Sequence, residues 1–391
     1  MGEAKGRLRV VIAGAGLRGE YMTALVKARP NAEIAAIVDA IPQKAEWLAK
    51  RLELTGARVF RSIEEALAKV EFDVGMVFTP DGRHADVAIP LLKAGKRVFC
   101  EKPLDITAEK CRALILADEA AGGKTFMGFN LRHAPFYATV KRCIDAGEIG
   151  RILTVQADEF YDGGRTYFRR WNGVRAESGG LWITKASHDF DLLVWLTSAR
   201  PLEVFAHAAK TYYVARPEAG KQCRACKIAD RCPDRAPPTP SELVRIGEEN
   251  GGRPYDLCLY NTPSDTFDHG IAQVRFENDI LATYTCNVVA GFTDRRLRVA
   301  GTKATLDGHL EGKTVMILRR DPRSVEDVPL VDSSGGHGGA DPIMVGRFLE
   351  FARAGCLPAC SPREAAVPVL IGLAATRSSD EGRPIAVEYL T

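Results

Sequence analysis

The stretch Leu8-Arg9-Val10-Val11-Ile12-Ala13-Gly14-Ala15-Gly16-Leu17-Arg18-Gly19 decides the fold of this chain. An apolar, β-branched run leads directly into three glycines with GxGxxG spacing, and a helical pattern follows. In such a turn Gly14 permits the tight reversal, Gly16 lets the backbone approach a pyrophosphate, and Gly19 lets the helix pack on the strand. The free N–H groups of the helix N-terminus would then face the phosphates of a dinucleotide.

The N-terminal third of the chain alternates short strand patterns with amphipathic helical patterns. Strands are expected at 8–13, 33–38, 58–60, 73–78, 97–100 and 125–128, and helices at 19–28, 42–51, 63–69, 84–94 and 108–121. This alternation is typical of βαβ units, whose right-handed crossovers build a doubly wound parallel sheet. We therefore expect an α/β chain with a Rossmann domain over residues 1–130.

Beyond about residue 150 the pattern changes to longer strands with few helices between them. Strands are expected at 152–160, 201–208, 270–276, 280–287, 296–299 and 315–318, and late helices at 341–354 and 362–378. Such runs predict an α+β domain over 131–391, with a large, open, mainly antiparallel sheet. A polar, proline-rich insertion at about 216–258 interrupts it, and we expect no core there.

Length and composition set the class of protein. A chain of 391 residues with 46% hydrophobic and 26% charged residues predicts two globular domains. The net charge of +3, with no runs of Lys or Arg, argues against nucleic-acid binding. No apolar stretch is long enough for a membrane span, and the N-terminus lacks the apolar segment of a secretory signal. We therefore expect a cytoplasmic protein.

The position of Asp39 favours NAD over NADP as the dinucleotide. Asp39 ends the second strand pattern, twenty residues after Gly19. A carboxylate there accepts hydrogen bonds from the ribose hydroxyls and repels a 2′-phosphate. The next residues, Ala40, Ile41 and Pro42, supply no cation to bind that phosphate. The alternative is an ordinary glycine-rich turn followed by a solvated aspartate.

Further motifs follow the glycine loop in a fixed order. They are Thr79-Pro80 with His84, Ala94–Cys100 leading into Glu101-Lys102-Pro103, Gly128-Phe129-Asn130-Leu131-Arg132, Gly147-Glu148-Ile149-Gly150, Ser178-Gly179-Gly180 and His188-Asp189-Phe190-Asp191. Together they resemble the Gfo/Idh/MocA family of oxidoreductases, in particular the subset with a Cys-rich insertion. The resemblance implies a sugar or cyclitol as substrate, and a homodimer or homotetramer formed through the C-terminal sheet.

The resemblance also assigns cofactor-binding and catalytic residues. It implies cofactor contacts from Gly14, Gly16, Leu17, Arg18, Gly19, Asp39, Thr79, Pro80, His84, Glu101, Lys102 and Asn130. It places Lys102 beside the nicotinamide and the substrate hydroxyl, where a cation stabilises the developing alkoxide. His188 is the expected general base, because imidazole titrates near neutral pH. The alternatives are a surface lysine in a turn and a capping or buried structural histidine.

Substrate-binding residues are expected around His188. The helical pattern over 187–196 puts Asp191 one turn beyond His188 on the same face, where it could bind a sugar hydroxyl. Family members commonly carry Asp four residues before this histidine, whereas this chain has Thr184 followed by Lys185. Because Thr184 supplies no negative charge, the sequence does not assign the route of the proton beyond Lys102. Further candidates, each of which could equally serve in packing, are Arg132, Tyr161, Arg169, Trp171 and His337.

The loop around His337 introduces alternative functions. Ser334-Gly335-Gly336-His337-Gly338-Gly339-Ala340-Asp341 resembles a segment of family members that process glycosides, including the NAD-dependent glycoside hydrolases. Those enzymes oxidise C3 transiently and then eliminate the aglycone. A third hypothesis is a sensor that binds NAD and sugar without turnover. The leading prediction remains an NAD-dependent dehydrogenase.

Four cysteines in the insertion have a spacing that suggests metal ligands. They are Cys223, Cys226, Cys232 and Cys258. Four thiolates satisfy tetrahedral zinc, and an iron–sulfur cluster needs the same number. A structural metal, zinc ahead of iron, would hold together a segment that lacks a core. The alternative is a set of reduced surface cysteines or a redox-labile pair.

Overall fold

The computed structural model describes residues 6–331 and 336–390. They form two compact units. Unit 1 comprises Met1–Gly128, Arg235–Leu257 and Pro342–Ala366, and unit 2 comprises Phe129–Asp234, Cys258–Asp341 and Val367–Thr391. Ser334 and Gly335, which belong to the loop around His337, lie outside the described residues.

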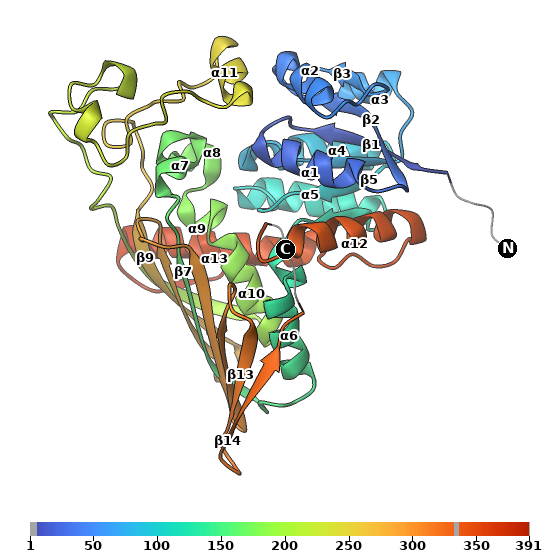
Figure 1. Cartoon of the computed structure of the whole chain (residues 1–391). Helices are drawn as coiled ribbons and strands as arrows, with labels where there is room; N and C mark the ends of the chain where they lie inside the picture. The colour runs from blue at the N-terminus through green and yellow to red at the C-terminus, as the bar shows by residue number, and fades with distance from the viewer. Residues whose placement is uncertain (1–5, 332–335, 391) are drawn as a thin grey trace. The chain divides into compact units, whose positions relative to one another are not determined.

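Unit 1 contains the parallel sheet expected from the N-terminal pattern (Figure 1). Its strands are β1 (Leu8–Ala13), β2 (Ala32–Val38), β3 (Arg58–Phe60), β4 (Val74–Val77), β5 (Arg97–Cys100) and β6 (Thr125–Met127). The helices between them are α1 (Leu17–Lys27), α2 (Pro42–Arg51), α3 (Ile63–Lys69), α4 (His84–Lys93) and α5 (Ala108–Ala120). The strand order β3-β2-β1-β4-β5-β6 reverses direction between β1 and β4. This strand order confirms the predicted Rossmann fold. In doubly wound sheets ligands bind at the point where the order reverses.

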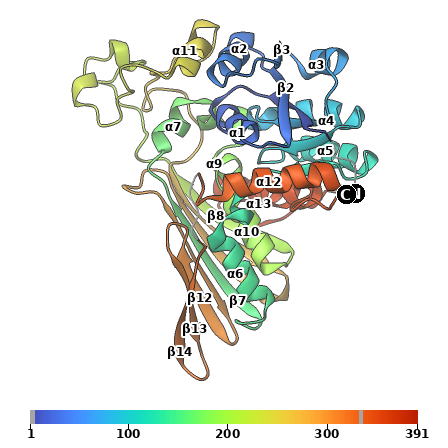
Figure 2. The ribbon, with the colours of Figure 1, turned by 45° about the vertical axis from the view of Figure 1, so that its right-hand side comes forward.

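Two segments from late in the sequence complete unit 1. From Pro342 onward, helix α12 (Ala340–Ala354) packs Phe348 on Phe99 of β5, with ring centroids 5.4 Å apart. Helix α11 (Glu242–Glu249) lies in the insertion and contacts α2, beside which it is seen in Figures 1 and 2. Its Leu243 and Ile246 are buried. The expectation that the insertion has no core is therefore wrong for this helix, whose apolar residues recur at helical spacing.

Unit 2 is built on a nine-stranded sheet. Its strands are β7 (Ile152–Phe160), β8 (Pro201–Ala209), β9 (His269–Phe276), β10 (Leu281–Asn287), β11 (Asp294–Gly301), β12 (Ala304–His309), β13 (Thr314–Arg319), β14 (Ser324–Pro329) and β15 (Ile385–Ala386). The order is β14-β13-β12-β11-β7-β10-β9-β8-β15, and neighbours run antiparallel except for the parallel pair β7–β10. This confirms the mainly antiparallel α+β domain, although β12, β14 and β15 were not predicted.

One face of this sheet is covered by helices and the other is open. The helices of unit 2 are α6 (Pro135–Asp145), α7 (Gly164–Arg169), α8 (Arg175–Ser178), α9 (Leu181–Thr184), α10 (Ser187–Thr197) and most of α13 (Pro362–Glu381). Figure 2 shows α6 and α10 along one side of the long strands. Burial alternates strictly along β9, and in β10 Tyr284 is buried while Leu281 is exposed. Period-two alternation is what a sheet covered on one face requires.

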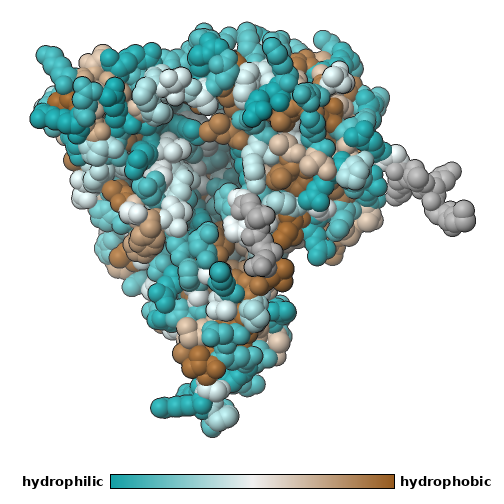
Figure 3. Space-filling model, viewed as in Figure 1, coloured by the Kyte–Doolittle hydropathy of each residue, from teal (hydrophilic) through white to brown (hydrophobic). Residues whose placement is uncertain are grey.

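The surface is predominantly hydrophilic on the face seen in Figure 3, where brown apolar residues form small separate groups among teal and white ones. Within the described part of the chain, no helix is both long and apolar enough to cross a membrane.

Candidate functional site

The glycine loop between β1 and α1 has room for a phosphate at one point. Gly14 has φ of +105°, and a Cβ there would lie 2.5 Å from the carbonyl oxygen of Phe78. A Cβ at Gly19 would lie 1.9 Å from the carbonyl oxygen of Gly14, so neither position tolerates a side chain. At Gly16, by contrast, no atom of the described residues other than Gly16 and its two chain neighbours lies within 4 Å of the Cβ position. Gly16 is also the N-cap of α1 and makes no side-chain cap, and an uncapped helix N-terminus suits an anion.

Asp39 lies at the end of β2 and is tied to this loop. Its Oδ2 accepts a hydrogen bond from the Ala15 amide at 2.8 Å, and its Oδ1 accepts one from the Ile41 amide at 2.9 Å. A carboxylate has about four lone-pair sites, so each oxygen keeps capacity for a ribose hydroxyl. The two hydrogen bonds from backbone amides fix the Asp39 carboxylate between the glycine loop and the start of α2.

Arg18 and Glu101, both expected at the cofactor, bind each other. Arg18 Nε lies 2.6 Å from Glu101 Oε1, and the Lys102 amide donates to Glu101 Oε2 at 3.0 Å. The ion pair thus connects the first turn of α1 to the segment after β5. It holds the backbone of Lys102 at the carboxyl end of the sheet, where ligands of this fold bind.

His84 also acts on this segment through backbone groups. Its Nδ1 lies 2.7 Å from the carbonyl oxygen of Pro103, and its Nε2 lies 3.1 Å from that of Thr79. His84 is buried and thereby fixes the Thr79-Pro80 turn against Glu101-Lys102-Pro103. The hydroxyl of Thr79 is buried without a hydrogen-bond partner among the described residues, as expected of a group that binds a ligand. Together with the space at Gly16, these residues fit a dinucleotide.

A second cluster lies in unit 2 around two imidazoles. His188 is a buried residue of α10, and its ring centroid lies 5.8 Å from that of His337. His337 Nδ1 lies 2.9 Å from Asp341 Oδ2, and Asp341 Oδ1 accepts a hydrogen bond from Asn130 Nδ2 at 2.8 Å. The ring of Phe129 lies nearly perpendicular to that of His188, with centroids 6.3 Å apart. The structure therefore groups Asn130, expected at the cofactor, with the two histidines.

Arg132 and Asp191, both expected at the substrate, form a buried ion pair. Arg132 Nε and one terminal nitrogen lie 2.8 and 2.7 Å from the two carboxylate oxygens of Asp191. The exposed fractions of the two side chains are 5% and 2%. In this bidentate geometry each carboxylate oxygen of Asp191 accepts a hydrogen bond from Arg132, so Arg132 fixes the position of Asp191.

Lys185 belongs to a charged network that was not predicted. Its ammonium lies 2.7 Å from Glu159 of β7 and 3.7 Å from the ring centroid of Tyr161. Arg295 of β11 pairs with the same carboxylate and, at 3.1 Å, with Asp189. All four charged groups are buried. Lys185 therefore acts within unit 2 as a fixed internal cation.

Burial and pairing shift the pKa values in this network in opposite directions. Burial would raise the pKa of Glu159, but the adjacent Arg295 and Lys185 bring it below its ordinary value. Burial would lower the pKa of Lys185, but Glu159 raises it above the usual range. Burial raises the pKa of Asp189 to about 7 in spite of Arg295. The network thus has one firm carboxylate, Glu159, and one that titrates near neutral pH, Asp189.

The other substrate candidates lie near this network or contact the insertion. The hydroxyl of Thr184 accepts a hydrogen bond from Asn172 at 3.2 Å, and Trp171 is half-buried at the start of the neighbouring turn. Arg169 instead donates to the carbonyl oxygen of Asp234 at 2.6 Å. The partners Glu159, Asp189, Arg295 and Asp341 were missed. Only Asp341 gave a local signal, the i,i+4 spacing from His337 at a helix start.

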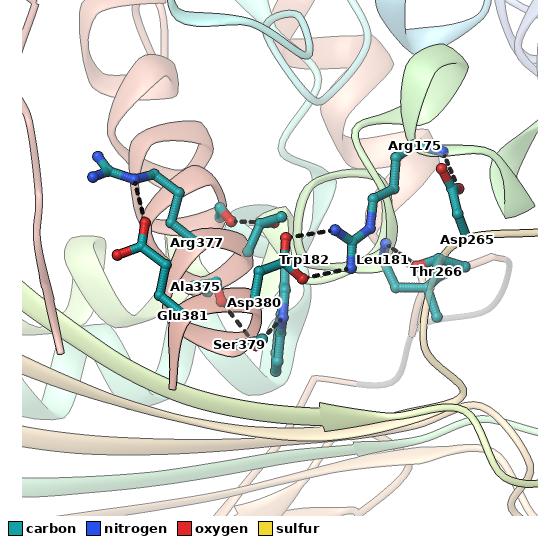
Figure 4. A network of polar contacts seen from close by, with 12 residues as sticks. Arg175, Leu181, Trp182, Asp265, Thr266, Ala375, Arg377, Ser379, Asp380 and Glu381 are labelled. Carbon is teal, nitrogen blue, oxygen red and sulfur yellow. Dashed lines mark hydrogen bonds and ion pairs between the residues drawn. The ribbon is translucent and has the colours of Figure 1, made fainter. Parts of the chain in front are cut away.

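A polar network anchors the segment before His188 to α13 (Figure 4). The guanidinium of Arg175 pairs with Asp380 through contacts of 2.7 and 3.2 Å. The indole of Trp182 donates to Ser379 at 3.2 Å, and the Leu181 amide donates to Thr266 at 2.9 Å. Gly179 and Gly180 in this segment have φ of +72° and +77°. The pair of glycines allows the turn, and the polar contacts fix the start of α9 after it.

The four cysteines of the insertion are all free thiols, and Cys258 is buried. Cys226 Sγ accepts a hydrogen bond from the Gly220 amide at 3.2 Å. Among residues 6–331 and 336–390 no group of three or more His, Cys, Asp or Glu side chains is placed to hold a metal ion. The structure therefore gives no support to the expected zinc or iron–sulfur site at Cys223, Cys226, Cys232 and Cys258.

Comparison with known proteins identifies the family of both domains. Residues 8–129 match the NAD-binding Rossmann fold of an oxidoreductase family, and residues 141–387 match the C-terminal α/β domain of the same family. A putative oxidoreductase of Bacillus subtilis, YteT, is 28% identical over 80% of this chain and 81% of its own. The scyllo-inositol 2-dehydrogenase (NAD(+)) of the same organism is 26% identical over 98% and 97%.

A solved structure shares the fold at lower identity. Levoglucosan dehydrogenase in complex with NADH superimposes with a TM-score of 0.78 at 20% identity, covering 98% of this chain and all of that one. With both of its domains matched in sequence and fold, the chain belongs to the Gfo/Idh/MocA family of oxidoreductases.

Proposed function

We propose that this chain is an NAD-dependent dehydrogenase of a sugar, a sugar derivative or a cyclitol. The observation that carries the proposal is a dinucleotide-type glycine loop in the same chain as a carboxylate-backed pair of imidazoles, His188 and His337. Relatives named inositol 2-dehydrogenase support the substrate class. The bound cofactor supplies a nicotinamide that accepts or returns a hydride.

The protein residues would supply electrostatics and proton transfer. Lys102, held by Glu101, is proposed to stabilise the developing alkoxide as the carbinol is oxidised. His188 is proposed to accept the hydroxyl proton. Thr184 and Trp171 are proposed to contact the substrate through a hydroxyl and an apolar ring face. Tyr161, Arg169, Lys185, Arg132 and Asp191 are proposed to shape the pocket, several of them through their ion pairs and backbone contacts.

NAD is proposed over NADP. Support comes from the Asp39 carboxylate, which amides of Ala15 and Ile41 hold in place and which would repel a 2′-phosphate. Residues 40–42 carry no positive charge. The scyllo-inositol 2-dehydrogenase (NAD(+)) that matches this chain over 97% of its own length is consistent with this preference.

Assembly, location and domain limits are also proposed. The open face of the large sheet exposes Ile271 and Leu281, each by about half, which favours a dimer or tetramer through that face. Ten free cysteines favour a reducing compartment such as the cytoplasm. We propose that the chain divides into domains at 1–130 and 131–391, and that it belongs to the subset of the family with a Cys-rich insertion.

The test is formation of NADH, followed by absorbance, across a panel of sugars, sugar acids and cyclitols. At least one substrate should be oxidised with NAD, and Lys102→Ala and His188→Ala should each lower kcat by about 100-fold or more. His309→Asn, a surface histidine paired with Asp294 on the sheet, is the matched control and should leave kcat unchanged. Equal activity of all three variants would refute the assignment.

The same panel extended to glycosides tests the alternatives. Aglycone release without accumulation of NADH would identify a redox-cycling glycoside hydrolase or lyase. Binding of NAD and sugar, measured by calorimetry, without either product would identify a sensor.

A further inference from the structure

His337 and Asp341 form an oriented pair beside His188. Because Nδ1 of His337 faces the Asp341 carboxylate at 2.9 Å, the neutral ring carries its proton on Nδ1 and presents Nε2 as the basic nitrogen. Asp341 itself is fully buried and is fixed through its other oxygen by Asn130. A carboxylate held in this way stabilises an imidazolium when the ring gains a second proton.

The two imidazoles differ in their access to water. The side chain of His188 is buried, whereas that of His337 is 38% exposed. The ring centroids lie 5.8 Å apart with an interplanar angle of 41°. At this spacing ring nitrogens can exchange a proton directly or through one water molecule. His337 thus lies beside His188 and is in contact with solvent.

The backbone of His337 is held in an unfavourable conformation. Its φ is +56°, in the left-handed region, and it precedes Gly338 and Gly339, which also have positive φ. Glycine would adopt this conformation without strain, yet the position carries histidine. A non-glycine residue keeps such a conformation where its surroundings hold it, and these positions cluster at functional sites.

We propose that His337, oriented by Asp341, carries the proton released in the reaction from His188 to solvent. This rests on the proposed dehydrogenase function. With NAD bound, the nicotinamide would accept the hydride of the carbinol, and His188 would accept its hydroxyl proton. The proton then passes to Nε2 of His337, Asp341 stabilises the imidazolium, and water or buffer removes the proton. Each turnover thus releases one proton and returns both rings to the neutral state.

The surrounding charges do not compete for this role. On α10 itself, Asp191 is bound to Arg132, and Asp189 is bound to Arg295. From the strands packed behind α10, Glu159 is paired with Lys185 and Arg295. These groups set the field around His188, and among the contacts described Asp341 is the carboxylate that faces His337.

The test separates hydride transfer from proton release in stopped flow, with NADH absorbance and a pH indicator in weak buffer. His337→Asn is chosen because asparagine tolerates a positive φ. We expect its single-turnover NADH formation to match that of the parent, its proton release to lag, and its kcat to fall by about tenfold or more. Added imidazole should restore kcat. Asp341→Asn should show the same defect more weakly, and His309→Asn should show none.

Two results would overturn the proposal. One is proton release in His337→Asn that keeps step with NADH formation at unchanged kcat. The other is a rise in KM alone that imidazole does not relieve, which would make His337 a substrate contact. If the parent forms no NADH with any substrate, the dehydrogenase function itself fails, which is distinguishable from a parent that turns over normally without needing His337.

Discussion

Removing Arg132 should leave the Asp191 carboxylate buried without its counter-ion and destabilise unit 2 strongly. Arg132 and Asp191 bind each other bidentately, with side chains 5% and 2% exposed. In Arg132→Met the aliphatic stem is retained, but the Asp191 carboxylate loses its counter-ion in a site that water does not reach. The variant therefore measures the cost of an unpaired charge more than the loss of packing.

The expected loss is about 3–5 kcal/mol in the free energy of unfolding, because breaking a buried pair leaves an uncompensated charge. That is roughly two to four orders of magnitude in the unfolding equilibrium. The double variant Arg132→Met/Asp191→Leu removes both charges and should recover to within about 2 kcal/mol of the parent. Exposure is so low that solvent screening does not reduce these values appreciably.

Urea unfolding followed by tryptophan fluorescence suits this measurement, since three of the four tryptophans, Trp171, Trp182 and Trp195, belong to unit 2. The matched control is Arg377→Met. Arg377 also has an N–O distance of 2.7 Å, to Glu388, but the exposed fractions are 47% and 77%. We expect a change below about 1 kcal/mol there. Equal effects of Arg132→Met and Arg377→Met would refute the reasoning.

Two further predictions concern the charged network and the glycine loop. The pKa of Asp189 is raised by burial to about 7, so between about pH 4 and pH 7 the native state binds more protons than the unfolded state and stability falls as pH rises. Asp189→Asn should remove this slope, as measured by urea unfolding of the parent and the variant at pH 5 and 7.5. If both proteins show the same pH dependence of the free energy of unfolding, the raised pKa is wrong. Gly16→Ala should weaken NAD binding, measured by fluorescence titration, about tenfold or more at unchanged stability, whereas Gly19→Ala should destabilise unit 1 itself because its Cβ meets the Gly14 carbonyl oxygen. Similar NAD affinity for Gly16→Ala and the parent would place the pyrophosphate elsewhere.

The features that were predicted correctly depend on local signals. Strands such as β4 are buried on both faces, so they appear in the sequence as short apolar runs, and Gly14 and Gly19 stand where no Cβ fits. Helix α10 was predicted over 187–196 and is observed over Ser187–Thr197. Such signals depend on neighbours within about one helical turn or one strand.

The ion pairs of unit 2 could not be found in this way. Lys185 meets Glu159 and Arg295, which lie on strands β7 and β11, and the register of those strands is a long-range property. Arg132 and Asp191 are separated by 59 residues. A charged residue in the sequence is taken as solvated by default, and only the fold shows that its counter-ion is buried with it. Strand β14 was not predicted because its residues, which are mostly exposed, show no apolar alternation.

Where the family resemblance implies an aspartate this chain has Thr184, and a second imidazole paired with a carboxylate, His337–Asp341, adjoins His188. An aspartate at position 184 would add a negative charge four residues before the imidazole that takes the proton. Thr184 lacks that charge, and its hydroxyl is bound by Asn172. Asp341 is buried, lies at a helix N-terminus and is aimed at His337, whose ring adjoins His188. A carboxylate is therefore still coupled to His188, but through a second imidazole, which extends the proton path by one ring and ends it at the surface.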